Sequence, residues 1–271
     1  MSQNKSKEVV VVIPIYTDEL SYDELHSLSQ VMKILCSYPI VIVKPISLAP
    51  DKLKDLYPEL LFTSFPDNYF NGIKAYNTLM LSAQFYKEFL DYEYLLIYQL
   101  DAFVFRDDLI KWCRQGYDYI GGPWIKREVY NYPLISSYMK FEHWVNSKLK
   151  RPDRQKLYNK VGNGGFSLRK VTAHYNALII CKEVASSYIE KKQYHLYNED
   201  VFWSVEVNNW LDVPFRYPDY LTALEFSFDK HPQYCYKLTG NRLPFGCHCW
   251  NKKHVIGFWR KFILPDSDQN L

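Results

Sequence analysis

Four short segments of the chain set acidic, imidazole or glycine residues among apolar neighbours, and such residues can bind cations, move protons or approach phosphates. They are QLDAF (99–103), GNGGFSLR (162–169), YNEDVFW (197–203) and PFGCHCW (244–250). Asp101 directly follows the apolar run 92–100. Because an ionised carboxylate is costly to remove from water without a cation, a donor or an open cleft, we expect Asp101 to have a partner.

Asn198, Glu199 and Asp200 open an apolar segment, with Asn198 as a plausible N-cap of a helix. Carboxylates in the first turn of a helix feel the positive end of its dipole. We therefore expect Asp200 to stay ionised and to be available as a base at neutral pH. Ordinary acidic charge at a helix start is the alternative.

The elements that must position these residues alternate between strand and helix over the first 124 residues. Apolar runs predict strands at 9–16, 39–45, 94–100 and 117–124. Ser21 and Glu24 form a capping box for a first helix, and further helices are predicted at 51–60, 73–90 and 107–116. This order predicts an α/β protein with a Rossmann-like, mostly parallel central sheet, in which ligands collect at the carboxyl ends of the strands.

The second half of the chain continues with a strand at 161–170 and a long helix at 170–192. Residues 125–160 lose the apolar period and become basic and aromatic, which is typical of an insertion or lid. We expect a single domain over 1–271, with 251–271 as a C-terminal tail.

Composition excludes several classes of protein. The 271 residues are 48% hydrophobic and 17% aromatic, and the net charge is only +3, so the totals carry no nucleic-acid footprint. No run of 18 apolar residues predicts a membrane span, and the start of the chain is interpreted as a strand instead of a signal peptide. The six cysteines lack framework spacing, which favours free thiols and a cytoplasmic location.

Together and in this order, the four segments resemble GT-A type glycosyltransferases. The similarity covers most of the chain and is nearest to a bacterial family of glycosyltransferase-like proteins of unknown function, through LIYQLDAFVF, GYDYIGGPW, GNGGFSLR, NEDVFW and PFGCHCW. The resemblance implies a transferase that moves a sugar from a nucleotide-sugar, by preference a UDP-sugar, to an acceptor hydroxyl with inversion. Its acceptor would be a glycan or lipid-linked glycan in surface polysaccharide or glycoconjugate synthesis.

The same resemblance implies a role for Asp101, which occupies the place of the D-x-D motif that binds the donor and a divalent cation, Mn²⁺ or Mg²⁺. Only one carboxylate stands here, because Ala102 follows it. A cation requirement is therefore open, and Lys252 and Lys253 could instead steady the leaving diphosphate.

His248 resembles the late histidine that completes the metal site in several GT-A families, and a hydrogen-bonded core histidine is the alternative. Zinc is not expected, because no second ligand pair has the required spacing. A Cys–His nucleophilic pair is not expected either, since adjacent residues on a strand point to opposite faces.

The resemblance further assigns Asp200 as the base, with Glu199 holding the acceptor or bracing its loop. Gly164 and Gly165 would present N–H groups to the donor sugar, and Arg169 would pair with a site carboxylate or brace the fold. Positions expected to hold the donor base and ribose are Tyr16, Tyr76 and Asn77, each with packing as the alternative.

Two other interpretations remain open. The absence of a second D-x-D carboxylate also suits a non-catalytic nucleotide- or carbohydrate-binding module, and a nucleotide-sugar hydrolase is a third candidate.

The tail segment NKKHVIGFWRKFILP mixes basic and aromatic residues, so we expect either peripheral membrane contact or packing of Trp250, Phe258 and Trp259 into the domain.

Overall fold

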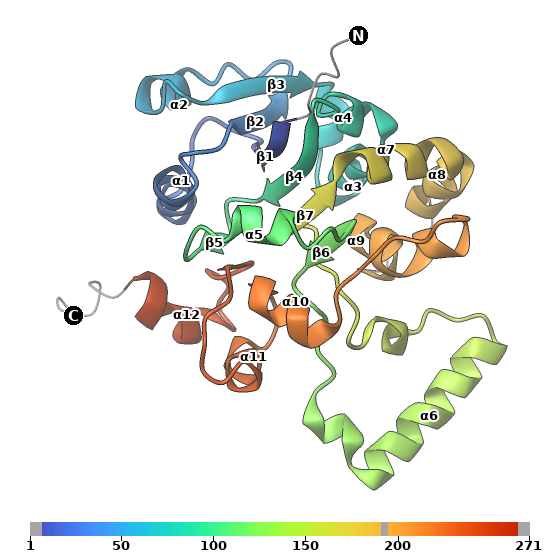
Figure 1. Cartoon of the computed structure of the whole chain (residues 1–271). Helices are drawn as coiled ribbons and strands as arrows, with labels where there is room; N and C mark the ends of the chain where they lie inside the picture. Colours follow the sequence, from blue (N-terminus) through green and yellow to red (C-terminus); the bar gives the residue numbers. More distant parts are fainter. Residues whose placement is uncertain (1–6, 191–194, 265–271) are drawn as a thin grey trace.

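A six-stranded mixed sheet forms the centre of the computed structural model, which describes residues 7–190 and 195–264 (Figure 1). The strand order is β3-β2-β1-β4-β7-β6. The strands are β1 (Lys7–Pro14), β2 (Ile40–Pro45), β3 (Leu61–Phe65), β4 (Tyr92–Tyr98), β6 (Tyr119–Gly121) and β7 (Phe166–Lys170). β3, β2, β1 and β4 pair in parallel, whereas β7 runs antiparallel to both β4 and β6.

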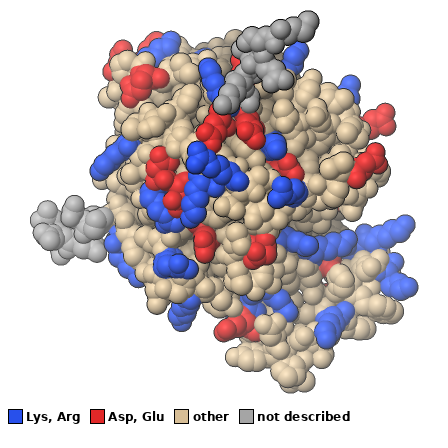
Figure 2. Space-filling model, in the orientation of Figure 1, with Lys and Arg blue, Asp and Glu red and all other residues tan. Residues whose placement is uncertain are grey.

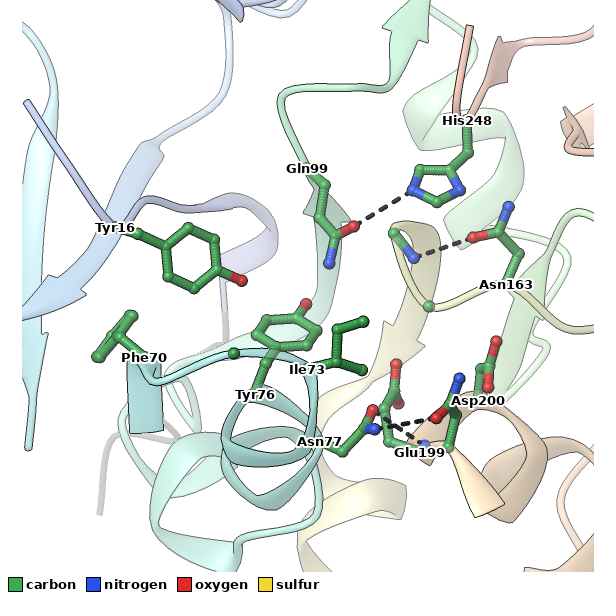
Figure 3. Close-up of a pocket in the computed structure, with 14 residues that line it drawn as sticks. Tyr16, Phe70, Ile73, Tyr76, Asn77, Gln99, Asn163, Glu199, Asp200 and His248 are labelled. Atoms are coloured by element: carbon green, nitrogen blue, oxygen red, sulfur yellow. Dashed lines mark hydrogen bonds between the residues drawn. The ribbon is translucent and has the colours of Figure 1, made fainter. Parts of the chain in front are cut away.

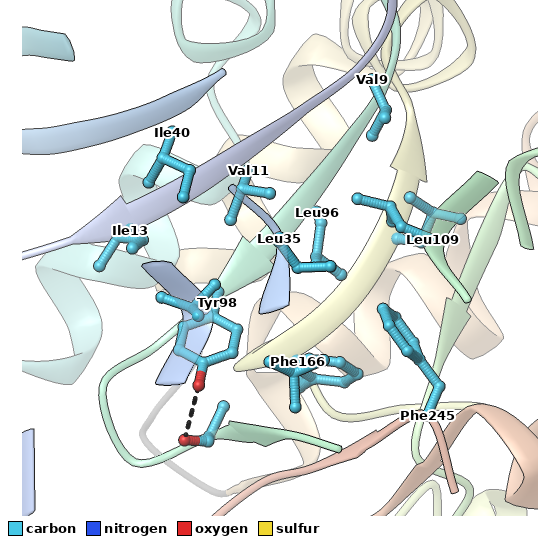
Figure 4. Close-up of a cluster of buried hydrophobic side chains, with 14 of the residues drawn as sticks. Val9, Val11, Ile13, Leu35, Ile40, Leu96, Tyr98, Leu109, Phe166 and Phe245 are labelled. Carbon is cyan, nitrogen blue, oxygen red and sulfur yellow. Dashed lines mark hydrogen bonds between the residues drawn. The ribbon is translucent and has the colours of Figure 1, made fainter. Parts of the chain in front are cut away.

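Both faces of the sheet are covered, which explains the β-branched run in β1. Val9, Val11 and Ile13 point into one core cluster, and Val10 and Val12 point into another on the opposite face. Figure 4 shows the first cluster, where β1 and β4 meet α1 (Tyr22–Ile34). A strand buried on both sides has no need of alternating polar residues.

The helices flank the sheet and the segments that leave it. The capping box of α1 is confirmed, because Ser21 Oγ accepts from the Glu24 amide and Glu24 Oε2 accepts from the Ser21 amide. The other helices before β7 are α2 (Asp51–Leu56), α3 (Ile73–Met80), α4 (Ala83–Lys87), α5 (Leu109–Cys113) and α6 (Pro133–Lys148). After β7 come α7 (Val171–Ile180), α8 (Lys182–Glu190), α9 (Glu199–Val201), α10 (Tyr220–Phe226), α11 (Pro232–Leu238) and α12 (Ile256–Ile263).

A second, three-stranded sheet positions the late histidine. It has the order β5-β9-β8 and consists of β5 (Phe103–Val104), β8 (Ser227–Phe228) and β9 (Gly246–Cys247). β9 pairs antiparallel with β5 and parallel with β8. Asp101, Asp229 and His248 each lie within two residues of one of these strands. The pairing of the strands therefore brings the three side chains together.

Several predicted elements differ in the structure. The strand predicted at 117–124 is shorter and forms β6. β7 lies between β4 and β6 and runs antiparallel to both, so the run of parallel neighbours stops at β4. The helix predicted at 73–90 breaks after Met80 because Ser82 caps a new helix by accepting from the Phe85 amide. The helix predicted at 170–192 breaks at Cys181, and its last two residues lie outside the described chain.

Residues 125–160 are largely helical, contrary to the expected irregular segment. They form α6 between two short 3₁₀ turns, and Figure 1 shows this insertion standing away from the sheet. We use "the insertion" for residues 125–160 below.

The tail packs into the protein as far as it is described. Trp250, Phe258 and Trp259 are at most 5% exposed and belong to a third core cluster. Of the two alternatives for the tail, packing of these aromatic residues is the one found, while residues 265–271 lie outside the described part. None of the helices in 7–190 and 195–264 has the length and apolar character that a membrane crossing requires.

Candidate functional site

A cavity of about 530 Å³ opens where the carboxyl ends of β1 and β4 meet α3, β7 and α9 (Figure 3). Its lining includes Tyr16, Phe70, Ile73, Tyr76, Asn77, Gln99, Asn163, Gly164, Gly165, Asn198, Glu199, Asp200 and His248. A neighbouring hollow of about 300 Å³ is lined by Asp101 and Lys252 and shares Tyr16 and Gln99 with the cavity. Residues that are far apart in the sequence therefore meet at one edge of the sheet, as expected for a sheet of this kind.

Asp101 has the partners that its position after a buried strand required. Its Oδ1 lies 3.0 Å from His248 Nε2, and its Oδ2 lies 3.2 Å from Lys252 Nζ. Burial alone would raise the pKa of the Asp101 carboxyl, but the charges of His248 and Lys252 outweigh burial and hold the pKa well below its usual range. Asp101 is thus an ionised carboxylate.

His248 is held as an imidazolium between two carboxylates. Burial by itself would lower its pKa, but Asp101 and Asp229 raise the pKa well above the ordinary histidine value. Its Nδ1 lies 3.5 Å from Asp229 Oδ1, and its Nε2 lies 3.2 Å from Gln99 Oε1. Asp229 was missed in the sequence, although it follows the short strand 227–228 just as Asp101 follows an apolar strand.

Cys249 turns back toward His248, which corrects the expectation that the two side chains point apart. β9 ends at Cys247, and Cys249 has a φ of 57°, so strand alternation does not apply. Its Sγ lies 3.2 Å from His248 Nδ1 and 3.6 Å from Asp101 Oδ2. The geometric reason given above for setting aside a Cys–His pair is therefore wrong.

These three side chains form a donor set that fits a divalent cation. Ligand atoms of Asp101, His248 and Cys249 all lie within 4.8 Å of one another, and the set offers one oxygen, one nitrogen and one sulfur. His248 must lose its proton before it can ligate, so a cation and a proton compete for this position.

Asp200 lies in a turn that hydrogen bonds hold against α3. Asn77 Nδ2 donates to Asn198 Oδ1 at 3.1 Å, and the Glu199 amide donates to Asn77 Oδ1 at 3.3 Å. Asn198 stands at the N-cap position, but its side chain makes no capping hydrogen bond. Asn77 therefore positions the acidic turn, and its amide is largely engaged in doing so.

Asp200 does not have the low pKa expected from the helix dipole. Burial, followed by the negative charge of Glu199, raises the pKa of its carboxyl to about 7. The turn at α9 contains three residues and continues as a π-helix, Phe202–Glu206, and burial of the carboxyl outweighs the helix dipole. A carboxyl with a pKa near neutrality suits a group that accepts and releases protons.

Glu199 is an anchor within the core. It is 2% exposed, and its Oε1 lies 2.9 Å from Nη2 of the fully buried Arg169. Arg169 also donates to the Tyr86 hydroxyl at 2.9 Å and to Ser167 Oγ at 3.0 Å. The expected pairing of Arg169 with a carboxylate is confirmed, and its partner is Glu199.

The two glycines make room for charged side chains. A methyl group at Gly164 would collide with the Glu199 carboxylate, and one at Gly165 would collide with the His248 ring and come within 2.6 Å of Gln99 Oε1. The Gly165 amide donates to Asn163 Oδ1 at 3.1 Å, so the expectation that this N–H faces a sugar hydroxyl is wrong. The glycines are needed for close approach of the site's own side chains.

An aromatic wall completes the cavity. Tyr16 is 49% exposed at its rim and packs edge-on against Phe70, with ring centroids 5.9 Å apart. Burial and, to a smaller extent, Asp101 raise the pKa of Tyr16 to about 12, so its hydroxyl stays protonated. Tyr76 is buried and also lines the cavity. Of the two lysines after His248, Lys252 pairs with Asp101, and Lys253 is exposed.

Solved glycosyltransferase structures share this fold. The galactosyltransferase LgtC, solved with donor and acceptor sugar analogues, has a TM-score of 0.52 and 12% identity over 94% of either chain. Mouse xyloside xylosyltransferase 1 has a TM-score of 0.50 and 14% identity, with 89% of this chain and 97% of that one covered. At these identities the similarity establishes the fold, and the chain has the GT-A fold.

The bifunctional glycosyltransferase WbbM has a TM-score of 0.50 and 14% identity over 89% of this chain. The present chain spans only 45% of that protein's length. No curated protein matches the sequence.

A family model described as "Protein of unknown function (DUF5672)" matches residues 59–248. The match includes Asp101, the glycine segment, the 198–200 turn and His248, and it covers well over half of the chain. The chain belongs to this family.

Proposed function

We propose that the chain is a single-domain glycosyltransferase that moves a sugar from a nucleotide-sugar, by preference UDP-linked, to an acceptor hydroxyl. One observation carries the proposal: Asp101, paired with His248 at 3.0 Å, and Asp200 line adjoining hollows at the carboxyl edge of a GT-A sheet. A cavity of about 530 Å³ also falls in the range of small-molecule sites.

The proposed chemistry is a single displacement. The acceptor oxygen attacks the anomeric carbon, the bond from that carbon to the diphosphate oxygen breaks, and Asp200 takes the proton of the hydroxyl. A base with a pKa near 7 is well matched to this step, because it is substantially ionised at neutral pH and still attracts a proton. One base and one displacement give inversion at the anomeric carbon.

The leaving diphosphate would lie between the positive groups at the other end of the site. His248 and Lys252 are charged donors near Asp101 and would stabilise the negative charge that develops there. Where a divalent cation displaces the proton of His248, Asp101, His248 and Cys249 would hold it, and it would supply positive charge to the diphosphate in place of the imidazolium. Tyr16 and Phe70 offer aromatic surface for the nucleoside.

Nucleotide release from a panel of UDP-, GDP- and CDP-sugars tests this proposal, with and without simple glycosides as acceptors. We expect acceptor-dependent release that falls by at least about a hundredfold in Asp200→Asn, the size of effect expected for a lost general base. The exposed Asp212 provides a matched control, and Asp212→Asn should keep its activity.

Nucleotide binding measured by calorimetry separates the alternatives. Asp200→Asn should bind nucleotide as the unmodified protein does, because Asp200 lies at the acceptor end of the proposed site. Binding without any turnover would contradict the proposal in favour of a binding module. Nucleotide release at the same rate with and without an acceptor would contradict the proposal in favour of a hydrolase.

A further inference from the structure

The insertion exposes an unusual amount of apolar surface on α6. The side chains of Leu134, Tyr138 and Phe141 are 88%, 66% and 63% exposed, and Trp144, which stacks on Phe141, is 57% exposed. Leu134, Tyr138, Phe141, Val145 and Leu149 follow a spacing of four, three, four and four residues, and Trp144 lies next to Val145. That spacing places them along one face of a helix.

The opposite side of α6 faces the rest of the insertion. Met139 is buried, and its carbonyl accepts from Gln155 Nε2 at 2.8 Å, while His143 pairs with the buried Asp153. The helix is therefore already anchored on one side. Its exposed stripe, Leu134 to Leu149, is an outer surface with no covering element among the described residues.

The insertion also carries a strong positive charge. It contains nine Lys and Arg residues against three Asp and Glu, a net charge of +6, whereas the whole chain carries +3. In residues 7–190 and 195–264, none of these nine basic side chains forms an ion pair. Figure 2 shows basic side chains gathered where the insertion, at the lower right, meets the body, with a largely uncharged surface beyond them.

The insertion leaves and rejoins the fold beside the candidate site. The Trp124 amide donates to the Lys160 carbonyl at 2.9 Å, and the Asn159 amide donates to the Trp124 carbonyl at 2.8 Å. Gly162, against which the Trp124 ring packs, precedes the cavity residues Asn163 and Gly164. The two ends of the insertion therefore lie next to the cavity, while α6 itself stands away from the sheet.

We propose that α6 and its basic flanks dock the protein on an anionic lipid bilayer, with the apolar stripe inserted at the interface. Tryptophan, tyrosine, phenylalanine and leucine on one helix face, with Lys and Arg beside them, are the composition of interfacial helices. A second copy is disfavoured, because two insertions would bring +6 against +6. A nucleic acid would engage the basic residues but leave Leu134 and Phe141 in water.

Vesicle flotation of the full chain tests this inference and does not depend on any enzymatic activity. Phosphatidylcholine vesicles are compared with vesicles of equal parts phosphatidylcholine and phosphatidylglycerol, at low and high salt. We expect binding to the anionic vesicles only, weakened by salt. Leu134→Ser/Phe141→Ser and Lys140→Glu/Lys148→Glu should each lower the partition coefficient by about tenfold or more.

The matched controls alter the same residue types elsewhere. Ile179→Ser/Ile180→Ser removes two exposed apolar side chains near the end of α7, far from α6 in Figure 1, and Lys33→Glu/Lys87→Glu reverses two exposed charges. Both should bind like the unmodified protein. Should the serine variant fail to fold, judged by its melting curve, the Lys140→Glu/Lys148→Glu pair and the lipid and salt dependence of the unmodified chain decide.

Three results would overturn the inference. The first is no flotation with anionic vesicles, and the second is flotation that the α6 variants and the controls reduce equally. The third is self-association in sedimentation velocity that Leu134→Ser/Phe141→Ser abolishes in the absence of vesicle binding, since that would assign the stripe to a second copy.

Discussion

Replacing Asp200 by Asn should make the protein more stable at alkaline pH while it removes the proposed base. The carboxyl has a pKa of about 7 in the fold against an ordinary value of 3.8. A raised pKa means that the folded state holds the proton more tightly than the unfolded chain. The unmodified protein therefore loses stability as pH rises from about 4 to about 7, and the asparagine variant does not.

The size of the effect follows from the same two values. A difference from 3.8 to about 7 corresponds to at most about 4 kcal/mol of unfolding free energy at pH 8. Asp200 is only partly buried, which reduces the penalty of its charge. We expect Asp200→Asn to gain about 2–4 kcal/mol over the unmodified protein at pH 8 and less than about 1 kcal/mol at pH 4.

Urea unfolding of both proteins across this pH range measures the difference directly, and thermal melting should show a gain of roughly 5–10 °C at pH 8. Asp212→Asn, at an exposed position, should show no pH-dependent difference. A difference for Asp200→Asn that is flat with pH, or that grows toward acid, would refute the reasoning about this carboxyl.

Three further predictions concern the groups around it. Arg169→Met leaves the buried Glu199 without its partner and should lower the unfolding free energy by about 3–5 kcal/mol. The double variant Arg169→Met/Glu199→Leu should recover most of this loss. An equal loss in both variants, measured by urea unfolding, would contradict the role of the ion pair. Gly165→Ala should cost about 1–3 kcal/mol and reduce nucleotide release, because its methyl group displaces His248. Gly257→Ala, which has open space in α12, should leave nucleotide release unchanged and should raise stability by up to about 1 kcal/mol. The affinity for Mn²⁺, measured by calorimetry, should rise with pH by up to about tenfold per pH unit while the cation displaces the proton of His248, and a pH-independent affinity would argue against His248 as a ligand.

The parts of the fold that the sequence predicts well are those where periodicity alone decides the outcome. The run 9–16 and the capping box at Ser21 and Glu24 specify a buried strand and a helix start without help from distant residues. The break at Ser82 and the antiparallel direction of β7, which runs between β4 and β6, depend on tertiary packing. A local pattern carries no information about either.

The candidate site shows the same division. Asp101 and His248 stand out because polar residues next to apolar strands need partners, and the structure brings them within 3.0 Å. The pKa of Asp200 depends on burial and on Glu199, and the approach of Cys249 depends on one left-handed residue. Asp229 also follows a strand directly, but that strand contains only two residues, too few for an apolar run to indicate it.

In the proposed mechanism, Asp101, Asp200 and His248 act on one nucleotide-sugar in adjoining hollows. A crystal structure of the chain soaked with UDP and Mn²⁺ tests it most directly. We predict the diphosphate beside His248 and Lys252 and the uridine against Tyr16, with Asp200 facing the space left for sugar and acceptor. Nucleotide bound at another surface, with these side chains untouched, would contradict the account.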